Sequence, residues 1–319
     1  MAAQAEVEDF VKPARAWLLT LALAVSPAYA DLRVFVVSGL GGEAEYAHRF
    51  EEQASAIAQA AKRAGAASEN VVQLGGENTK RDAFKRELST FVSKARKDDQ
   101  VVVVLIGHGS FDGDDYRFNI PGPDVTGREI AAILDKLAAN QQLVVNATSS
   151  SGAVAEIWKR PNRIVITATK SGGERNATRF AQYWVEALTS AEADRDKNET
   201  VTVEEAYEFA ARKVADTFKS DAALATEHSR IEGASAARFI VARLGDSASL
   251  PDDAALADLM KQQAGFDQRI EELKGRKGSL PEQQYYDELE KVLIDLAKLD
   301  RRIDERKTAL GGTQAREQR

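Results

Sequence analysis

The sequence predicts an α/β fold: a doubly wound, mostly parallel sheet with helices on both faces, followed by an α-helical hairpin. Between residues 31 and 245, short β-branched apolar runs alternate with amphipathic helical stretches, a pattern typical of strand–helix–strand units with parallel strands. The run QVVVVLIGHG at 100–109 is almost wholly apolar, as expected of a central strand covered on both faces. After residue 250 the apolar residues recur at spacings of three and four, which predicts helices alone.

The individual elements follow from the same patterns, taken in chain order. The expected strands cover residues 32–39, 70–74, 100–109, 142–148 and 163–169, and the expected helices cover 43–64, 79–96, 126–138 and 176–189, with a further short helix after 148. Thr126 begins the third long helix and Glu129 follows three residues later, which is the pattern of a capping box. The stretch FDGDDYRFNIPGP (111–123) contains Asp-Gly and Pro-Gly pairs, which predict a short hairpin.

The C-terminal region, residues 250–310, has a composition of its own. Two apolar-periodic stretches flank GRKGSLPEQQ at 275–284, which contains glycines and a proline that interrupt a helix. This predicts a helical hairpin with coiled-coil-like packing. Such a hairpin can dock on its own domain, or it can present a surface for a protein partner or for self-association.

The first 30 residues predict a secretory signal peptide. Lys12 and Arg15 precede the apolar run AWLLTLALAV, and Ala28 and Ala30 provide small residues before a cleavage site after Ala30. The run is about half the length that spans a bilayer, so we expect no membrane span after cleavage. We therefore expect the mature protein to be exported and, most simply, periplasmic.

Composition excludes several classes of function. The net charge is −7 and there is no basic stripe, so nucleic-acid binding is not expected. The chain has no cysteine, which excludes disulfides, thiolate metal sites and a cysteine nucleophile.

Two neighbouring strand ends carry residues suited to catalysis. The third strand ends in GHGS, with His108 between Gly107 and Gly109, and the fourth ends in NATSSSG with four consecutive hydroxyl residues. The carboxyl ends of parallel strands about 4.8 Å apart meet at one edge of the sheet, where ligands bind in such folds. A base, a hydroxyl and turn amides are the parts of nucleophilic catalysis. The alternative is a hydrogen-bonded structural histidine beside hydroxyls that cap a helix.

The segments VVVVLIGHGSFDG, LVVNATSSSG and RIVITATKSGGE together resemble the legumain-type cysteine peptidases, which have a caspase-like fold. The resemblance extends over residues 32–245. It implies that His108 is the general base. It also implies that the cysteine position is held by Ser149 when the motifs are aligned on Ser-Gly, or by Thr148 when they are aligned on Asn-Ala.

The same resemblance implies that the walls of a substrate pocket follow the fifth strand. Lys170, Glu174 and Arg175 lie there and would bind a charged group of the substrate. The glycines beside His108, Gly107 and Gly109, would let a substrate backbone come close. A solvated loop that caps the next helix is the alternative for the residues after the fifth strand.

The sequence departs from this family at the nucleophile. A thiol is partly ionised near pH 7, whereas an alcohol needs a base aligned at its proton, and the acid of the family motif is an amide here, Asn146. Two hypotheses remain. One is an exported, degenerate peptidase-like protein, a weak hydrolase of peptides that uses His108 with Ser149 or Thr148. The other is a non-catalytic pseudopeptidase that binds a peptide or a cell-envelope protein. Neither requires a cofactor.

The stretch DRDKNETVTVEE at 194–205 is similar to an EF-hand calcium loop. The predicted ligands are the side chains of Asp194, Asp196, Asn198 and Glu205 and the carbonyl of Thr200. Glu199 stands where the sharp turn favours glycine, and a left-handed backbone there costs about 1 kcal/mol. The alternative is an acidic turn between helices, capped by Thr202.

Overall fold

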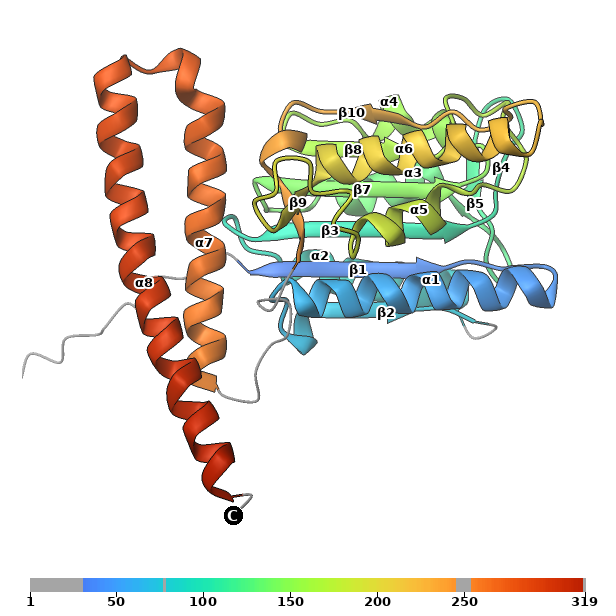
Figure 1. Ribbon diagram of the computed structural model, residues 1–319. Helices are drawn as coiled ribbons and strands as arrows, with labels where there is room; N and C mark the ends of the chain where they lie inside the picture. The colour runs from blue at the N-terminus through green and yellow to red at the C-terminus, as the bar shows by residue number, and fades with distance from the viewer. Residues whose placement is uncertain (1–30, 77–78, 245–253, 318–319) are drawn as a thin grey trace, which may run out of the picture.

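The computed structural model describes residues 31–76, 79–244 and 254–317, apart from some side chains in the last two helices (Figure 1). The predicted signal peptide, with its cleavage site after Ala30, lies outside the described residues. No helix in the described ranges is both long enough and apolar enough to cross a membrane.

A six-stranded sheet forms the centre of the fold, in the order β10-β8-β7-β3-β1-β2. Its strands are β1 (Leu32–Ser38), β2 (Val71–Leu74), β3 (Gln100–Gly107), β7 (Gln141–Thr148), β8 (Arg163–Thr167) and β10 (Arg230–Glu232). All neighbours are parallel except β10, which runs antiparallel to β8 at the edge. The doubly wound, mostly parallel sheet is therefore confirmed. Its strand order reverses between β1 and β3, and ligands bind near such reversals.

Helices cover both faces of this sheet (Figure 1). One layer contains α1 (Ala44–Arg63), α5 (Phe180–Ala187) and α6 (Val203–Ser220), and the other contains α2 (Arg81–Ser93), α3 (Gly127–Leu134) and α4 (Ala155–Trp158). Each layer encloses its own buried apolar cluster. Because side chains alternate along a strand, β3 sends Val102, Val104 and Ile106 into the α1/α5/α6 cluster and Val101, Val103 and Leu105 into the other.

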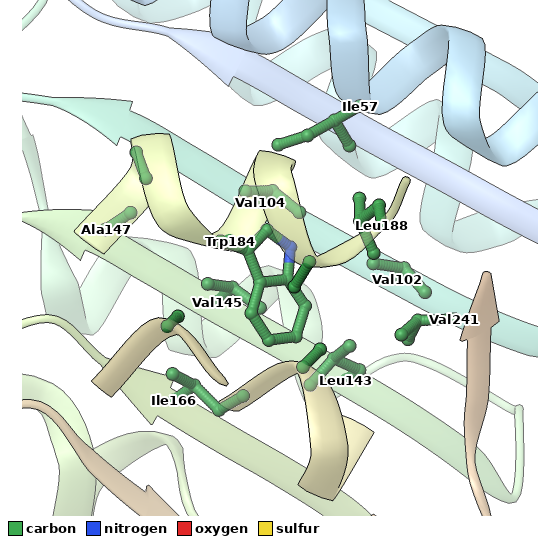
Figure 2. Close-up of a cluster of buried hydrophobic side chains, with 14 of the residues drawn as sticks. Ile57, Val102, Val104, Leu143, Val145, Ala147, Ile166, Trp184, Leu188 and Val241 are labelled. Atoms are coloured by element: carbon green, nitrogen blue, oxygen red, sulfur yellow. The ribbon is translucent and has the colours of Figure 1, made fainter. Parts of the chain in front are cut away.

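Trp184 of α5 lies at the centre of the α1/α5/α6 cluster. It is 2% exposed and is surrounded by side chains from the strands, including Val104 and Val145, and by Leu188 of its own helix (Figure 2). Burial of an indole of this size contributes a large part of the apolar stabilisation of this face.

Local signals predicted the start of α3 correctly but not the start of α5, and α3 ends at Leu134 rather than at residue 138. The predicted capping box at Thr126 and Glu129 is present. By contrast, α5 begins at Phe180 rather than at residue 176. The reason is long-range: Thr178 Oγ1 donates to the carbonyl of Ala147, 2.7 Å away, and the Glu227 carboxylate accepts from the backbone N–H groups of residues 179 and 180.

Two small sheets accompany the main one. The hairpin predicted at 111–123 is part of a three-stranded antiparallel sheet formed by β4 (Gly109–Phe111), β5 (Tyr116–Phe118) and β6 (Val125–Thr126). A second sheet pairs β9 (Thr200–Thr202) with β11 (Ile240–Arg243).

The C-terminal helices α7 (Ala254–Arg276) and α8 (Glu282–Glu317) form the predicted helical hairpin, joined by a short 3₁₀ turn, η5 (Lys277–Ser279). Two apolar clusters hold the helices together, one centred on Leu256, Leu259, Leu299 and Ile303, and the other on Leu273, Tyr285 and Val292. Gln141, at the start of β7, donates to Glu272 of α7 at 3.3 Å. The hairpin therefore lies at the amino edge of the sheet, opposite the carboxyl edge (Figure 1).

Candidate active site

His108 directly follows β3, and its ring lies on the α1 side of the sheet. The ring packs edge-on against Tyr46 and Phe50 of α1, with centroid distances of 5.0 and 5.2 Å. Partial burial lowers the pKa of His108 below its ordinary value; a hydrogen bond to the Gly41 backbone opposes the shift, and the charge of Arg49 adds to it. The imidazole is therefore neutral near pH 7, as a general base must be.

The glycines beside His108 allow the carboxyl ends of β3 and β7 to approach each other closely. A Cβ on Gly109 would lie 2.5 Å from the Ser149 carbonyl oxygen and 2.7 Å from Thr148 Oγ1, so no other residue fits there. Gly107 has φ +145°, and a Cβ there would lie 3.2 Å from the backbone of Gly39. The space beside these two glycines is occupied by other atoms of the protein. The segments after β3 and β7 are therefore in close contact, and no space remains there for a substrate backbone.

Thr148, the last residue of β7, is held in a buried polar network. Its hydroxyl donates to Asn146 Oδ1 at 2.8 Å and lies 2.6 Å from the hydroxyl oxygen of Tyr116. Both Asn146 and Thr148 are fully buried. Burial raises the pKa of Tyr116, so the phenol stays neutral and can donate into the network. The hydroxyl of Thr148 therefore has a structural role in this hydrogen-bond network.

The sheet also separates Thr148 from His108. Ala147 packs in the α1/α5/α6 cluster, whereas Tyr116, the partner of Thr148, packs in the opposite cluster. Since His108 lies against α1, the two side chains are on opposite faces. Ser149 lies in the turn directly after β7; if the alternation of the strand continued by one residue, its side chain would be on the side of His108.

Ser149 and Ser150 have hydroxyls without partners. Both residues are buried, and neither Oγ forms a hydrogen bond within the described structure. Ser149 therefore makes no direct hydrogen bond to His108, and contact through one water stays a prediction. Ser150 also has a left-handed backbone, with φ 57°, a strained conformation of the kind found at functional turns. The sequence motifs gave no reason to separate Ser150 from its neighbours.

Three other groups of this turn are hydrogen-bonded within the protein. Ser151 Oγ accepts from the Thr169 N–H at 3.1 Å. The N–H of Ser150 donates to the Glu174 carbonyl at 2.8 Å, and the N–H of Gly152 donates to Thr169 Oγ1 at 2.8 Å. These two amides are therefore not free to bind an oxyanion.

The loop after β8 is closed by Glu174. Its carboxylate accepts from the Lys170 N–H at 2.9 Å and lies 2.5 Å from Nδ1 of His228. Arg175 is exposed and reaches the carbonyl of Phe111 at 3.5 Å. Of the three residues predicted to bind substrate, Glu174 thus holds its own loop in place through these hydrogen bonds. Lys170 and Arg175 stay exposed at the surface of the loop. The pairing of Glu174 with His228 had no signal in the sequence, because 54 residues separate them.

A polar recess of about 230 Å³ opens beside His108. It is lined by Tyr46, Arg49 and Gln53 of α1, by Ala177, Thr178 and Arg179, and by Gln182 of α5. Tyr46 touches the His108 ring, and Thr178 is bonded to β7 next to the hydroxyl row. The recess and His108 therefore share the same face and the same edge of the sheet.

Arg49 gives this recess its charge. Its guanidinium lies 4.4 Å from the centre of the Tyr46 ring and pairs with no acid in the described part of the chain. Gln53 Oε1, in the same recess, is buried without a partner. The recess thus offers a cationic donor, the Arg49 guanidinium, which suits a carboxylate or an amide oxygen of a ligand, and a free acceptor, Gln53 Oε1, which suits an amide N–H.

Glu227 supports the other wall of the recess. It is 5% exposed, and it accepts from the N–H groups of Arg179 and Phe180 at 2.7 and 2.9 Å, which caps the start of α5. Burial raises the pKa of Glu227 to about 7, although both N–H groups favour the charged form.

The comparisons with known proteins place this site in a family. A model of the Peptidase C13 family matches residues 74–233, half of the chain, and the match contains His108, the hydroxyl row and the loop of Glu174. The chain belongs to the Peptidase C13 family. The legumain-type resemblance and the caspase-like fold are thereby confirmed, while helices α7 and α8 lie outside the matched range.

A solved structure resembles this C13-family chain more distantly. The protein GSU0716 from Geobacter sulfurreducens shares 13% identity and a TM-score of 0.43, over 63% of this chain and 94% of that one. No curated protein matches.

The acidic loop of the C13-family chain forms the capped turn expected as the alternative to a calcium loop. Thr202 and Glu205 make a capping box at the start of α6, and Glu199 has the left-handed backbone predicted for it, with φ 63°. Asp194 accepts from the N–H groups of residues 198 and 199. Asn198 Oδ1 accepts from the N–H and hydroxyl of Thr200 at 2.8 and 2.6 Å.

Calcium binding at this turn stays a prediction. One oxygen from each of Asp194, Asp196 and Glu205 lies within 4.8 Å of the others, so a cation would relieve their repulsion and stabilise the fold. We expect millimolar calcium to raise the melting temperature, and Glu205→Gln, which keeps a capping box, to abolish the shift. Glu204→Gln is the control, since it removes a neighbouring charge. An unchanged melting temperature and no heat on titration would assign the turn to structure alone.

Proposed function

We propose that this chain is a degenerate, peptidase-like protein that binds a peptide at the carboxyl edge of the sheet and does not cut it efficiently. The observation that carries the proposal is how the hydroxyls of residues 148 and 149 are hydrogen-bonded. Thr148 is bonded to Tyr116 and Asn146 on the face away from His108, and Ser149 has no hydrogen-bonded base.

Nucleophilic catalysis requires more than these residue types. An alcohol is a weak nucleophile until a base takes its proton, and the tetrahedral intermediate needs free donors for its oxygen. Here the hydroxyl–base bond is missing, and the amides of Ser150 and Gly152 already have acceptors. The parts present at the site thus support binding more strongly than they support hydrolysis.

The recess beside His108 supports the peptide as ligand. Arg49 and the Gln53 amide line the recess, and the neutral imidazole of His108 lies against Tyr46, another of its lining residues. Tyr46 adds an apolar wall. A peptide side chain that ends in a carboxylate or an amide matches this combination, because guanidinium groups bind such oxygens well.

Ser149 supports a second candidate, a weak Ser/His hydrolase. A buried hydroxyl without a partner costs about 1–3 kcal/mol, and a bond to His108 would remove that cost. Alternation along β7, continued one residue past Thr148, would put Ser149 on the side of His108. A bound peptide that brings the two together would activate the serine.

One experiment separates the two candidates. The mature protein would be titrated with fluorescein-labelled Ala-Ala-X-Ala peptides in which X is Asp, Asn or Lys, and each peptide would then be weighed by mass spectrometry. We expect the Asp and Asn peptides to bind and stay intact, and the Lys peptide to bind more weakly because Arg49 repels it. Arg49→Gln should weaken binding of the Asp peptide about tenfold, whereas Arg86→Gln, an exposed arginine on the other face, should leave it unchanged.

Two results would contradict the binding proposal. One is cleavage of a peptide that is lost in both Ser149→Ala and His108→Ala, which would establish the hydrolase. The other is equal binding of all three peptides by the native chain and Arg49→Gln, which would exclude the recess as the ligand site.

We also propose that the protein is exported and that its mature chain begins at Asp31. In addition to the signal-peptide pattern, the backbone N of Asp31 lies 3.2 Å from a carboxylate oxygen of Asp99, a residue that is 1% exposed. Cleavage after Ala30 would turn this N–H into an ammonium group beside a buried carboxylate, which strengthens the contact.

N-terminal sequencing of the protein from its native host tests the export proposal. We expect the first residue to be Asp31 and the protein to appear in the periplasmic fraction. A chain that still begins at Met1 would contradict both expectations.

A further inference from the structure

The helix α8 carries a second apolar stripe in addition to the one that packs on α7. Tyr286, Leu293 and Ile294 are 46–48% exposed, and Ala297 is exposed as well. Three of the six large apolar side chains exposed in the described residues thus fall within about two turns of one helix. With Leu289 and Glu290 they line an open groove of about 450 Å³.

Hydrophobic surface concentrated in this way marks an interaction site. The stripe from Tyr286 to Ala297 runs for about 17 Å along α8, at 1.5 Å per residue. Its residues recur at intervals of three and four, so they form one face that a second helix can cover. The side of α8 that faces α7 is already filled by Tyr285, Val292 and Leu299.

The charges of α8 indicate what covers this face. Residues 282–290 contain four acids and no base, whereas residues 293–301 contain two acids and two bases. A parallel copy of the helix would place acidic segment against acidic segment. An antiparallel copy centred between residues 291 and 292 would place each acidic segment against the segment of its partner in which acids and bases balance.

We propose that the protein forms a two-fold symmetric dimer in which the α8 helices of two copies pack antiparallel through this stripe. The symmetry axis passes between residues 291 and 292, so Tyr286 of one copy faces Ala297 of the other. Asp287 and Lys298 lie on the same flank of the stripe. In an antiparallel pair such flanks meet, so each Asp287 faces the Lys298 of the other copy.

The present partners of these two residues are exposed surface contacts within α8. Asp287 accepts from the Gln283 amide at 2.8 Å. Lys298 contacts Asp295 at 3.1 Å on the surface, with its side chain 63% exposed, and pairs of this kind contribute little. A self-complementary surface satisfies the requirement of a two-fold interface, since each copy supplies both halves. The hairpin lies at the amino edge of the sheet, so the dimer leaves the carboxyl edge of both copies open.

The absence of cysteine allows a direct test by cross-linking. Mature protein carrying Tyr286→Cys would be mixed with protein carrying Ala297→Cys and oxidised. We expect a disulfide between the two variants and little within either variant alone, because identical positions lie about 17 Å apart along an antiparallel pair and a disulfide needs Cα atoms within about 7 Å. Arg302→Cys mixed with Tyr286→Cys is the control for random collision, since residue 302 lies on another side of the helix.

Sedimentation equilibrium supplies the second readout. The mature protein should be dimeric at tens of micromolar, and Leu293→Glu, a change at an exposed position, should make it monomeric without altering its circular dichroism. Asp287→Lys and Lys298→Asp should each weaken the dimer about tenfold, and the double exchange should restore it. Efficient disulfides within each single variant would show a parallel dimer and overturn the proposal. A monomer at 100 µM would also overturn it, as would a stripe that binds phosphatidylglycerol vesicles in place of a second copy.

Discussion

The parallel pairing of β3 with β7 is the constraint on which the candidate site depends. Gly107 is paired with Thr148, and Gly109 lies close to the Ser149 carbonyl and the Thr148 hydroxyl, which brings the next residues of both strands together. The same pairing fixes which face each side chain occupies. His108 is directed to α1 and Thr148 to Tyr116, so proximity in the sheet does not by itself make a catalytic pair. Ser149 keeps an unpartnered hydroxyl, and its contact with the histidine stays a prediction.

Much of the fold was predictable because the signals are local. The apolar runs of β1, β3 and β7 and the capping box at Thr126 are readable within a few residues of sequence. The start of α5 was not, because Glu227, far along the chain, caps it. The clamp between Glu174 and His228 and the antiparallel edge strand β10 depend on tertiary contacts in the same way. Short strands of this kind have no periodicity of their own to detect.

In the candidate site, too, the local features were predictable from the sequence and the tertiary contacts were not. The motif around His108 and the row of hydroxyls could be found from the sequence, and their placement at one edge followed from the topology of parallel strands. Their functional states could not be found. Whether a hydroxyl is locked, as in Thr148, or without a partner, as in Ser149, depends on Tyr116, which reaches the site from a small sheet inserted after β3. The recess with Arg49 was likewise not apparent, because it forms only where α1 and α5 meet.

The central claim is that the Thr148 hydroxyl stabilises the strand end and does not serve as a nucleophile. A double-mutant cycle with Tyr116→Phe and Thr148→Val, read by urea unfolding, tests it most directly. Each single change should lower the free energy of unfolding by about 1–3 kcal/mol, because it leaves buried polar partners unpaired. The double variant should lose at least about 0.5 kcal/mol less than the sum, as expected for residues in contact. Unchanged stability in Thr148→Val, together with loss of a measurable peptidase activity, would contradict the account.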